Sequence, residues 1–144
     1  MRGISIEGHL YDAIGNINLL ALPRHQVWIR SRWDEHTRRQ YQNDCILRAR
    51  RGFALVSPFI SQHEAAVRDV ALREGHSVIV LTDNGFSSVS QCPGTLYDYC
   101  TRGQVLVLVP SELPHVDRKP AITRQECVML NERAEEIVGK APVF

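Results

Sequence analysis

The sequence has no long hydrophobic run and no start of the kind that directs secretion. None of its apolar stretches approaches the roughly 18 consecutive apolar residues that a membrane-spanning helix needs. Residues 1–5, Met-Arg-Gly-Ile-Ser, lack the apolar centre and the cleavage site of a signal peptide. With 144 residues, 44% of them hydrophobic and 23% charged, the composition is that of a globular domain. We therefore expect one domain over residues 1–144, with a cytoplasmic location and no membrane partner.

Several motifs that carry chemistry are also missing. The chain contains no GxGxxG, GxxxxGK[ST], GxSxG or HExxH, which disfavours dehydrogenase chemistry and nucleotide hydrolysis of the common types. The cysteines form no CxxC pair and no paired zinc spacing; they are Cys45, Cys92, Cys100 and Cys127. We predict free thiols, with reactivity of Cys92 in a loop as an alternative, and neither a metal site nor a cofactor.

Lysine is absent from residues 1–51, which hold nine arginines and five acidic residues, although the whole chain has a net charge of only +1. Arginine makes planar, bidentate contacts with phosphate and carboxylate groups. Two interpretations follow for Arg30, Arg32, Arg38 and Arg39. They form an anion-binding patch, or they belong to a solvated helix face.

Four short, continuously apolar runs alternate with helix-like segments. They lie at residues 27–29, 53–56, 78–81 and 105–109. Parallel strands that crossover helices bury on both faces have this composition, whereas half-exposed strands alternate apolar and polar residues. The sequence therefore predicts an α/β fold: a three-layer, Rossmann-like domain with a mostly parallel sheet of about four strands.

Glycines and capping residues mark where the helices begin and end. A glycine follows the polar last turn of each one, at Gly52, Gly75, Gly103 and Gly139. Capping signals precede three of them, at Asp34, at Ser61 with Glu64, and at Thr123 with Glu126. We predict helices over residues 34–51, 61–74, 94–102 and 123–138.

The first 24 residues are predicted to be a leader to a core formed by residues 25–144. Within the leader, residues 15–23 are expected to make one or two helical turns that end at a proline. The apolar residues 19–22 are a possible docking surface for another chain, either a partner or a second copy. A protein-interaction module and a homo-oligomer are therefore among the alternatives.

Ligands of open parallel sheets bind beyond the carboxyl ends of the strands, where the strand order reverses. Four loops are predicted to reach that edge, at residues 31–34, 57–61, 83–94 and 110–123. Helix N-termini there favour an anion, because their first backbone N–H groups are free. The predicted ligand and phosphate contacts are Ser31, Arg32, Ser57, Ser61, Asp83, Asn84 and Gly85.

Each of these positions also has a structural interpretation. The Ser61–Glu64 cap accounts for both residues, and Asp-Asn-Gly at 83–85 is a good turn sequence in any protein. Trp33 and Phe86 could stack on a base or close the ends of the core.

The stretch 53–61, with Glu64 and the stretch 73–81, resembles the Rossmann-like core of the DNA-processing protein A (Smf) family. It is similar also to the wider superfamily, which includes the lysine-decarboxylase-like phosphoribohydrolases. In that pattern a strand ends in a serine-containing loop, a helix follows, and a glycine turn leads to the next strand. Residues 15–20, before a strand that ends at Ser31, resemble small stand-alone bacterial relatives.

This resemblance spans residues 15–110 and implies a Rossmann-like domain related to DNA-processing protein A. The Ser-Gly pair of the family is Ser57-Pro58 here, and proline offers no N–H donor to a phosphate.

The leading hypothesis is therefore binding without catalysis. The expected ligand is a nucleotide or a single-stranded nucleic acid, with the arginines at its phosphates and Trp33 or Phe86 on a base. The alternative is a small hydrolase of a nucleotide or phosphoribosyl compound, with Glu64 or Asp83 as general acid or base.

Overall fold

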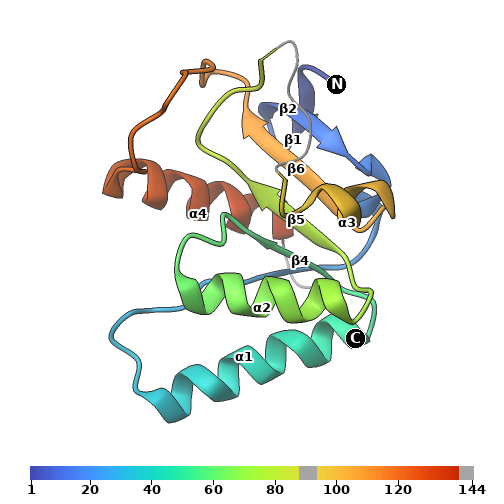
Figure 1. The fold of residues 1–144 in the computed structure, drawn as a ribbon, viewed down its shortest axis with the longest axis vertical. Helices are drawn as coiled ribbons and strands as arrows, with labels where there is room; N and C mark the ends of the chain where they lie inside the picture. Colours follow the sequence, from blue (N-terminus) through green and yellow to red (C-terminus); the bar gives the residue numbers. More distant parts are fainter. Residues whose placement is uncertain (88–93, 140–144) are drawn as a thin grey trace.

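The computed structural model describes residues 1–87 and 94–139, which form an α/β fold around one sheet (Figure 1). Six strands lie in the order β1-β2-β6-β5-β4-β3. Four of them are parallel, namely β3 (Arg24–Gln26), β4 (Ala54–Ser57), β5 (Val78–Leu81) and β6 (Val105–Pro110). The α/β class and the mostly parallel sheet are confirmed, whereas the expected count of about four strands is wrong.

The two additional strands form an N-terminal hairpin. β1 (Ile4–Ile6) pairs antiparallel with β2 (His9–Gly15), and β2 pairs antiparallel with β6. The connecting Glu7 and Gly8 both have positive φ, 49° and 81°, as a tight hairpin turn requires. Residues 1–24 are thus no separate leader, because β2 is an inner strand of the sheet.

The remaining strands follow the predicted apolar runs with one exception. All residues of β4, β5 and β6 are buried, as expected for strands covered on both faces. β3 lies three residues before its predicted position, since the polar residues 24–26 pair with β4 at the edge of the sheet. The apolar run beyond it still contributes Val27 and Ile29 to the core.

Three of the four α-helices begin where their capping residues predicted, whereas the helix expected over residues 94–102 spans only Tyr97–Thr101 and has no side-chain cap. The four helices are α1 (Glu35–Arg50), α2 (Gln62–Arg73), α3 (Tyr97–Thr101) and α4 (Arg124–Val138), preceded by the 3₁₀ helix η1 (Ile17–Ala21). Asp34 caps α1, and capping boxes begin α2 and α4. Each of the four predicted terminal glycines has a positive φ.

The helices cover both faces of the sheet. The parallel strands follow their sequence order across it, so that α1, α2 and α3 pack on one face, around Leu55, Val78 and Val105. After β6 the chain changes face, and α4 packs with η1 on the other side, around Leu106 and Leu130. The strand order therefore does not reverse among the parallel strands.

The apolar segment 19–22 is not an exposed docking surface, in contrast to the prediction. Leu19 is 4% exposed, and Leu20 and Leu22 pack against the same core as α4. η1 thus covers the sheet within its own chain.

Two of the cysteines are free, Cys45 and Cys127, whereas Cys100 is disulfide-bonded, which corrects the prediction of free thiols for that residue. Cys92 lies outside the described residues. No helix in the described ranges has both the length and the apolar character to cross a membrane.

Candidate functional site

A cavity of about 730 Å³, hereafter the main cavity, lies beyond the carboxyl ends of β4 and β5. Loop residues 82–86 after β5 form one part of its wall, and Pro58 and Ile60 after β4 another. Lys119 and His115 come from the segment that follows β6, and Arg68 comes from α2. The cavity thus lies at the edge of the sheet where the predicted loops were expected to meet.

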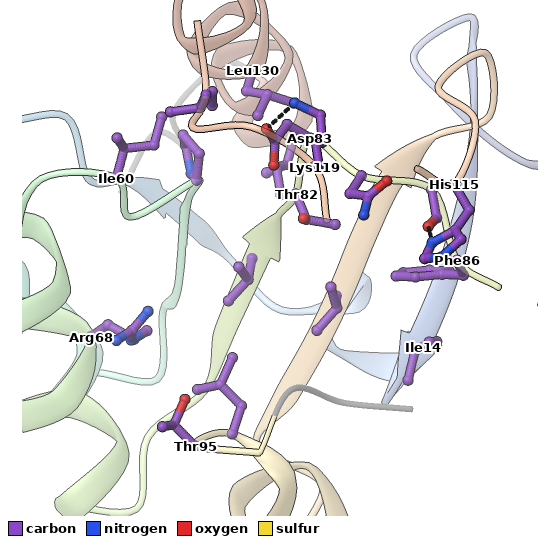
Figure 2. A pocket seen from close by; sticks show the side chains of 18 of the residues that line it. Ile14, Ile60, Arg68, Thr82, Asp83, Phe86, Thr95, His115, Lys119 and Leu130 are labelled. Atoms are coloured by element: carbon purple, nitrogen blue, oxygen red, sulfur yellow. Dashed lines mark hydrogen bonds and ion pairs between the residues drawn. The ribbon is translucent and has the colours of Figure 1, made fainter. Parts of the chain in front are cut away.

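Apolar side chains from three neighbouring strands line the main cavity, namely Ile14, Val80 and Val107. In Figure 2, Arg68 and Thr95 lie on one side of the cavity and Phe86 and His115 on the opposite side. A ligand between these walls would meet a cation on one side and an aromatic ring on the other.

Lys119 holds two carboxylates together at the rim of the main cavity. Its Nζ lies 2.7 Å from Asp83 Oδ2 and 2.9 Å from Glu126 Oε2. The hydrogen bond with Asp83, followed by that with Glu126, raises the pKa of Lys119. The Thr123 backbone N–H, followed by Lys119, lowers the pKa of Glu126. Asp83, a predicted ligand contact, is therefore already neutralised by a lysine of its own chain.

Asn84 and Gly85 join the loop after β5 to the segment after β6. The Asn84 side chain donates to the Val116 carbonyl at 3.0 Å and accepts from the Val116 N–H at 2.8 Å. Gly85 N–H donates to the Pro114 carbonyl, and a Cβ at Gly85 would lie 2.4 Å from the Leu113 oxygen. Both residues line the main cavity, but their polar groups hold two loops together.

His115 also joins the loop after β5 to the segment after β6, and we call this contact between the two segments the junction. Its Nδ1 lies 2.9 Å from the Gly85 carbonyl and its Nε2 lies 2.8 Å from Asp117 Oδ1. The hydrogen bond to Asp117, and then that to Gly85, raises the pKa of His115. Protonation of His115 therefore strengthens the contact between the two loops.

The start of α2 is built from three of the predicted residues. Ser61 Oγ accepts from Glu64 N–H, and Glu64 Oε1 accepts from Ser61 N–H, each at 3.1 Å. Ser57, fully buried, accepts from the N–H of Phe59, which has a φ of 50°. These hydrogen bonds fix the loop between β4 and α2.

Glu64 has a second partner across the molecule. Its Oε2 accepts from the Ile29 N–H at 2.9 Å, and the side chain is only 3% exposed. Both carboxylate oxygens thus hold backbone groups, while Asp83 is held by Lys119. A general acid or base needs an oxygen within reach of substrate, so Glu64 would have to release one of its contacts, whereas Asp83 would act beside the Lys119 ammonium group through Oδ1. The hydrolase alternative stays a prediction.

The predicted arginine patch divides into two parts. Arg38 and Arg39 lie on α1, 3.9 Å and 2.8 Å from Glu35. Arg30 and Arg32 instead line a second hollow, of about 550 Å³, between residues 28–32 and the first two turns of α4. We call this hollow the arginine groove; its other lining residues are Trp28, Ile29, Ser31, Arg124, Cys127, Val128 and Asn131.

The two candidate stacking residues are in different environments. Trp33 is half-buried and packs against Tyr41, with ring centroids 5.0 Å apart, at the end of the core under α1. Phe86 packs against the same core and also lines the main cavity. Only Phe86 is thus placed at the wall of a cavity.

Sequence reasoning missed Arg68, Thr95 and Lys119 in the main cavity, and Arg124 and Asn131 in the arginine groove. The residues of α4 in the groove, at 124, 127, 128 and 131, have the spacing of one helix face. That spacing predicts that the four residues share a helix face. It does not predict that residues 28–32 lie opposite this face, because their position depends on how α4 packs on the sheet.

Comparison of the chain with family models, with curated proteins and with solved structures gave no match. Within residues 1–87 and 94–139, no group of three or more His, Cys, Asp or Glu side chains could hold a metal ion. A functional argument for this chain therefore starts from the chemistry of the main cavity and the arginine groove.

Proposed function

We propose that the protein binds a mononucleotide in the main cavity and does not transform it. The observation that carries the proposal is the cavity itself, with apolar strand residues beneath a cation on one wall and an aromatic ring on the other. Its volume is in the range of about 300–1,000 Å³ that small-molecule sites occupy. A phosphate, a sugar and a base together need these three kinds of surface.

Arg68 is the residue we assign to the phosphate. Its Nε donates to Asp69 Oδ1 at 3.1 Å, which leaves the terminal guanidinium nitrogens for a ligand. The side chain is 21% exposed and lies over the Phe59 ring, 5.9 Å from its centroid. Lys119 is less suitable for this role, because two carboxylates already neutralise it.

Phe86 is the residue we assign to the base. It lies across the cavity from Arg68 in Figure 2, and an aromatic ring can stack on any base. Binding without catalysis is supported by the contacts of the two candidate acids, since Glu64 and Asp83 are both engaged within the chain.

The proposal is tested by isothermal titration calorimetry with adenosine and guanosine 5′-monophosphates. Arg68→Ala should weaken binding at least ~10-fold, because hydrogen bonds to charged groups contribute about 1.5–3 kcal/mol. The matched control is Arg73→Ala on the same helix, at an exposed position that does not line the cavity. Equal affinity of wild type and Arg68→Ala would contradict the assignment.

Single-stranded nucleic acid is the competing ligand, and salt dependence separates the two. Binding to many phosphates weakens steeply as salt is added, whereas one phosphate contact gives a shallow dependence. Tight, steeply salt-dependent binding of oligonucleotides with no binding of mononucleotides would refute the proposal. A relationship to DNA-processing protein A stays a prediction.

A further inference from the structure

Three arginines from two separate parts of the chain line the arginine groove. Arg30 and Arg32 follow β3, and Arg124 is the first residue of α4. No described residue forms an ion pair with any of the three, in contrast to Arg38, Arg39 and Arg133, which lie beside glutamates. Arginines without a carboxylate partner leave their N–H donors and their charge to an anion in the groove.

The shape of the groove is held by hydrogen bonds behind it. The Ile29 N–H donates to the buried Glu64 carboxylate, and the Gln26 side chain donates to the Asn131 carbonyl at 3.0 Å. The Arg30 guanidinium lies 3.2 Å from the centroid of the Trp28 ring, which orients it. These hydrogen bonds therefore fix the backbone that carries Arg30 and Arg32 beside α4.

Asn131 adds an independent sign of a ligand. This side chain lines the groove, is 3% exposed, and donates through Nδ2 to the Cys127 carbonyl at 2.9 Å. That bond identifies the other amide atom as the oxygen, and Oδ1 is buried with no hydrogen-bond partner among the residues that the structure describes. A buried acceptor without a donor is unfavourable, and a ligand hydroxyl or amine that reaches this oxygen would supply the missing hydrogen bond.

We propose that the arginine groove binds a small phosphomonoester that carries a hydroxyl or amino group, with the phosphate on Arg30, Arg32 and Arg124 and the donor on Asn131. Three guanidiniums match the charge and the several acceptor oxygens of a phosphate. This site shares no lining residue with the main cavity, so the proposal is independent of mononucleotide binding there.

Cys127 provides a direct readout, because it is free, partly buried and inside the groove. Burial, followed by the charge of Glu64, raises the pKa of its thiol, so alkylation with iodoacetamide is best done at alkaline pH. The extent of modification is measured on the peptide that contains Cys127. Glycerol 3-phosphate, which has both a phosphate and hydroxyl donors, should protect this thiol in a saturable manner, whereas glycerol should not.

Variants assign the protection to the proposed contacts. Arg124→Ala, at an exposed position, should raise the concentration for half-protection at least ~10-fold, while Arg73→Ala and Arg68→Ala leave it unchanged. Asn131→Ala should remove the preference for glycerol 3-phosphate over ethyl phosphate, which has no hydroxyl. A melting temperature for each variant verifies that it is folded.

Three outcomes would overturn the inference. The first is the absence of protection by glycerol 3-phosphate in the wild-type protein, a result that does not depend on any variant being folded. The second is protection that Arg124→Ala leaves unchanged. Loss of protection in Arg68→Ala would instead place the ligand in the main cavity and refute the groove, without affecting the mononucleotide proposal.

Discussion

The helices α2 and α4 begin with the same capping box, yet the two glutamates have different second partners. Glu64 is 3% exposed, and its second oxygen accepts from the backbone N–H of Ile29. The Glu126 side chain is 22% exposed, and its second oxygen is paired with the Lys119 ammonium group. The second carboxylate oxygen of Glu64 therefore makes a buried hydrogen bond, whereas that of Glu126 makes a partly exposed ion pair.

Each box positions the wall of a different hollow. Through Ile29, the box of α2 holds the segment that carries Arg30 and Arg32. Through Lys119, the box of α4 holds the loop residue Asp83 at the main cavity. A local motif thus defines a helix start, while the tertiary partner of its glutamate decides which site the motif supports and how much stability depends on it.

The largest difference between the boxes is expected for Glu64→Ala. The variant removes the acceptors of two N–H groups, of Ser61 and Ile29, and each unpaired buried donor costs about 1–3 kcal/mol. We expect the free energy of unfolding to fall by about 3 kcal/mol, measured by urea denaturation.

Two further variants test whether burial causes that loss. Glu64→Gln keeps one acceptor oxygen and should lie between wild type and Glu64→Ala. Glu126→Ala should cost less, because water can replace the partners of a carboxylate that is already partly exposed. If Glu126→Ala were as destabilising as Glu64→Ala, burial would not be what distinguishes the two boxes.

A smaller effect is expected from Gly85→Ala, which tests the junction at the main cavity. The new Cβ would lie 2.4 Å from the Leu113 oxygen and 2.7 Å from His115 N, so that the two loops must separate. We expect a loss of about 2 kcal/mol, as in other overpacked sites, together with weaker mononucleotide binding.

Gly94→Ala is the matched control for that substitution. Apart from its chain neighbours, no heavy atom of residues 1–87 and 94–139 would lie within 4 Å of a Cβ at Gly94, so the unfolding free energy should change by at most about 0.5 kcal/mol. Equal losses for the two glycine variants would mean that the approach of the loops at Gly85 contributes nothing specific.

The sequence predicts what depends on local chemistry. The capping residues located the starts of α1, α2 and α4, the terminal glycines marked the ends of all four helices, and the buried runs located β4, β5 and β6, because these signals act within a few residues. The hairpin had a signal as well, since Ile4 and Ile6 alternate with polar residues before Glu7-Gly8. Its strands were too short for the continuous-run criterion.

The hollows were predictable only in part. Loop residues 83–86 were expected at the carboxyl edge of the strands, and all four line the main cavity. Their pairing with Val116 and Lys119 was not predictable, because it joins loops about 30 residues apart. Arg124 lies at the arginine groove only because α4 packs on the sheet beside β3. The tertiary packing of the chain after β6 determines this position, and no local sequence signal predicts it.

The smallest predicted effect on stability is that of Thr123→Ala, which separates the two hydrogen bonds of the capping box at the start of α4. Thr123→Ala removes the hydroxyl that accepts from Glu126 N–H, and loss of an N-cap hydroxyl costs about 1 kcal/mol. The main cause of the lowered pKa of Glu126 is the backbone N–H of residue 123, which alanine retains.

The pKa of Glu126 should therefore stay below its ordinary value of 4.5 in Thr123→Ala, as followed by NMR titration of the carboxyl group. A carboxylate with a lowered pKa stabilises the folded state above its unfolded pKa, and this contribution is lost as the pH falls through the folded pKa. Wild type and Thr123→Ala should lose it over the same acid range. A return of the pKa to its ordinary value in the variant would show that the hydroxyl, and not the backbone, holds the glutamate in place.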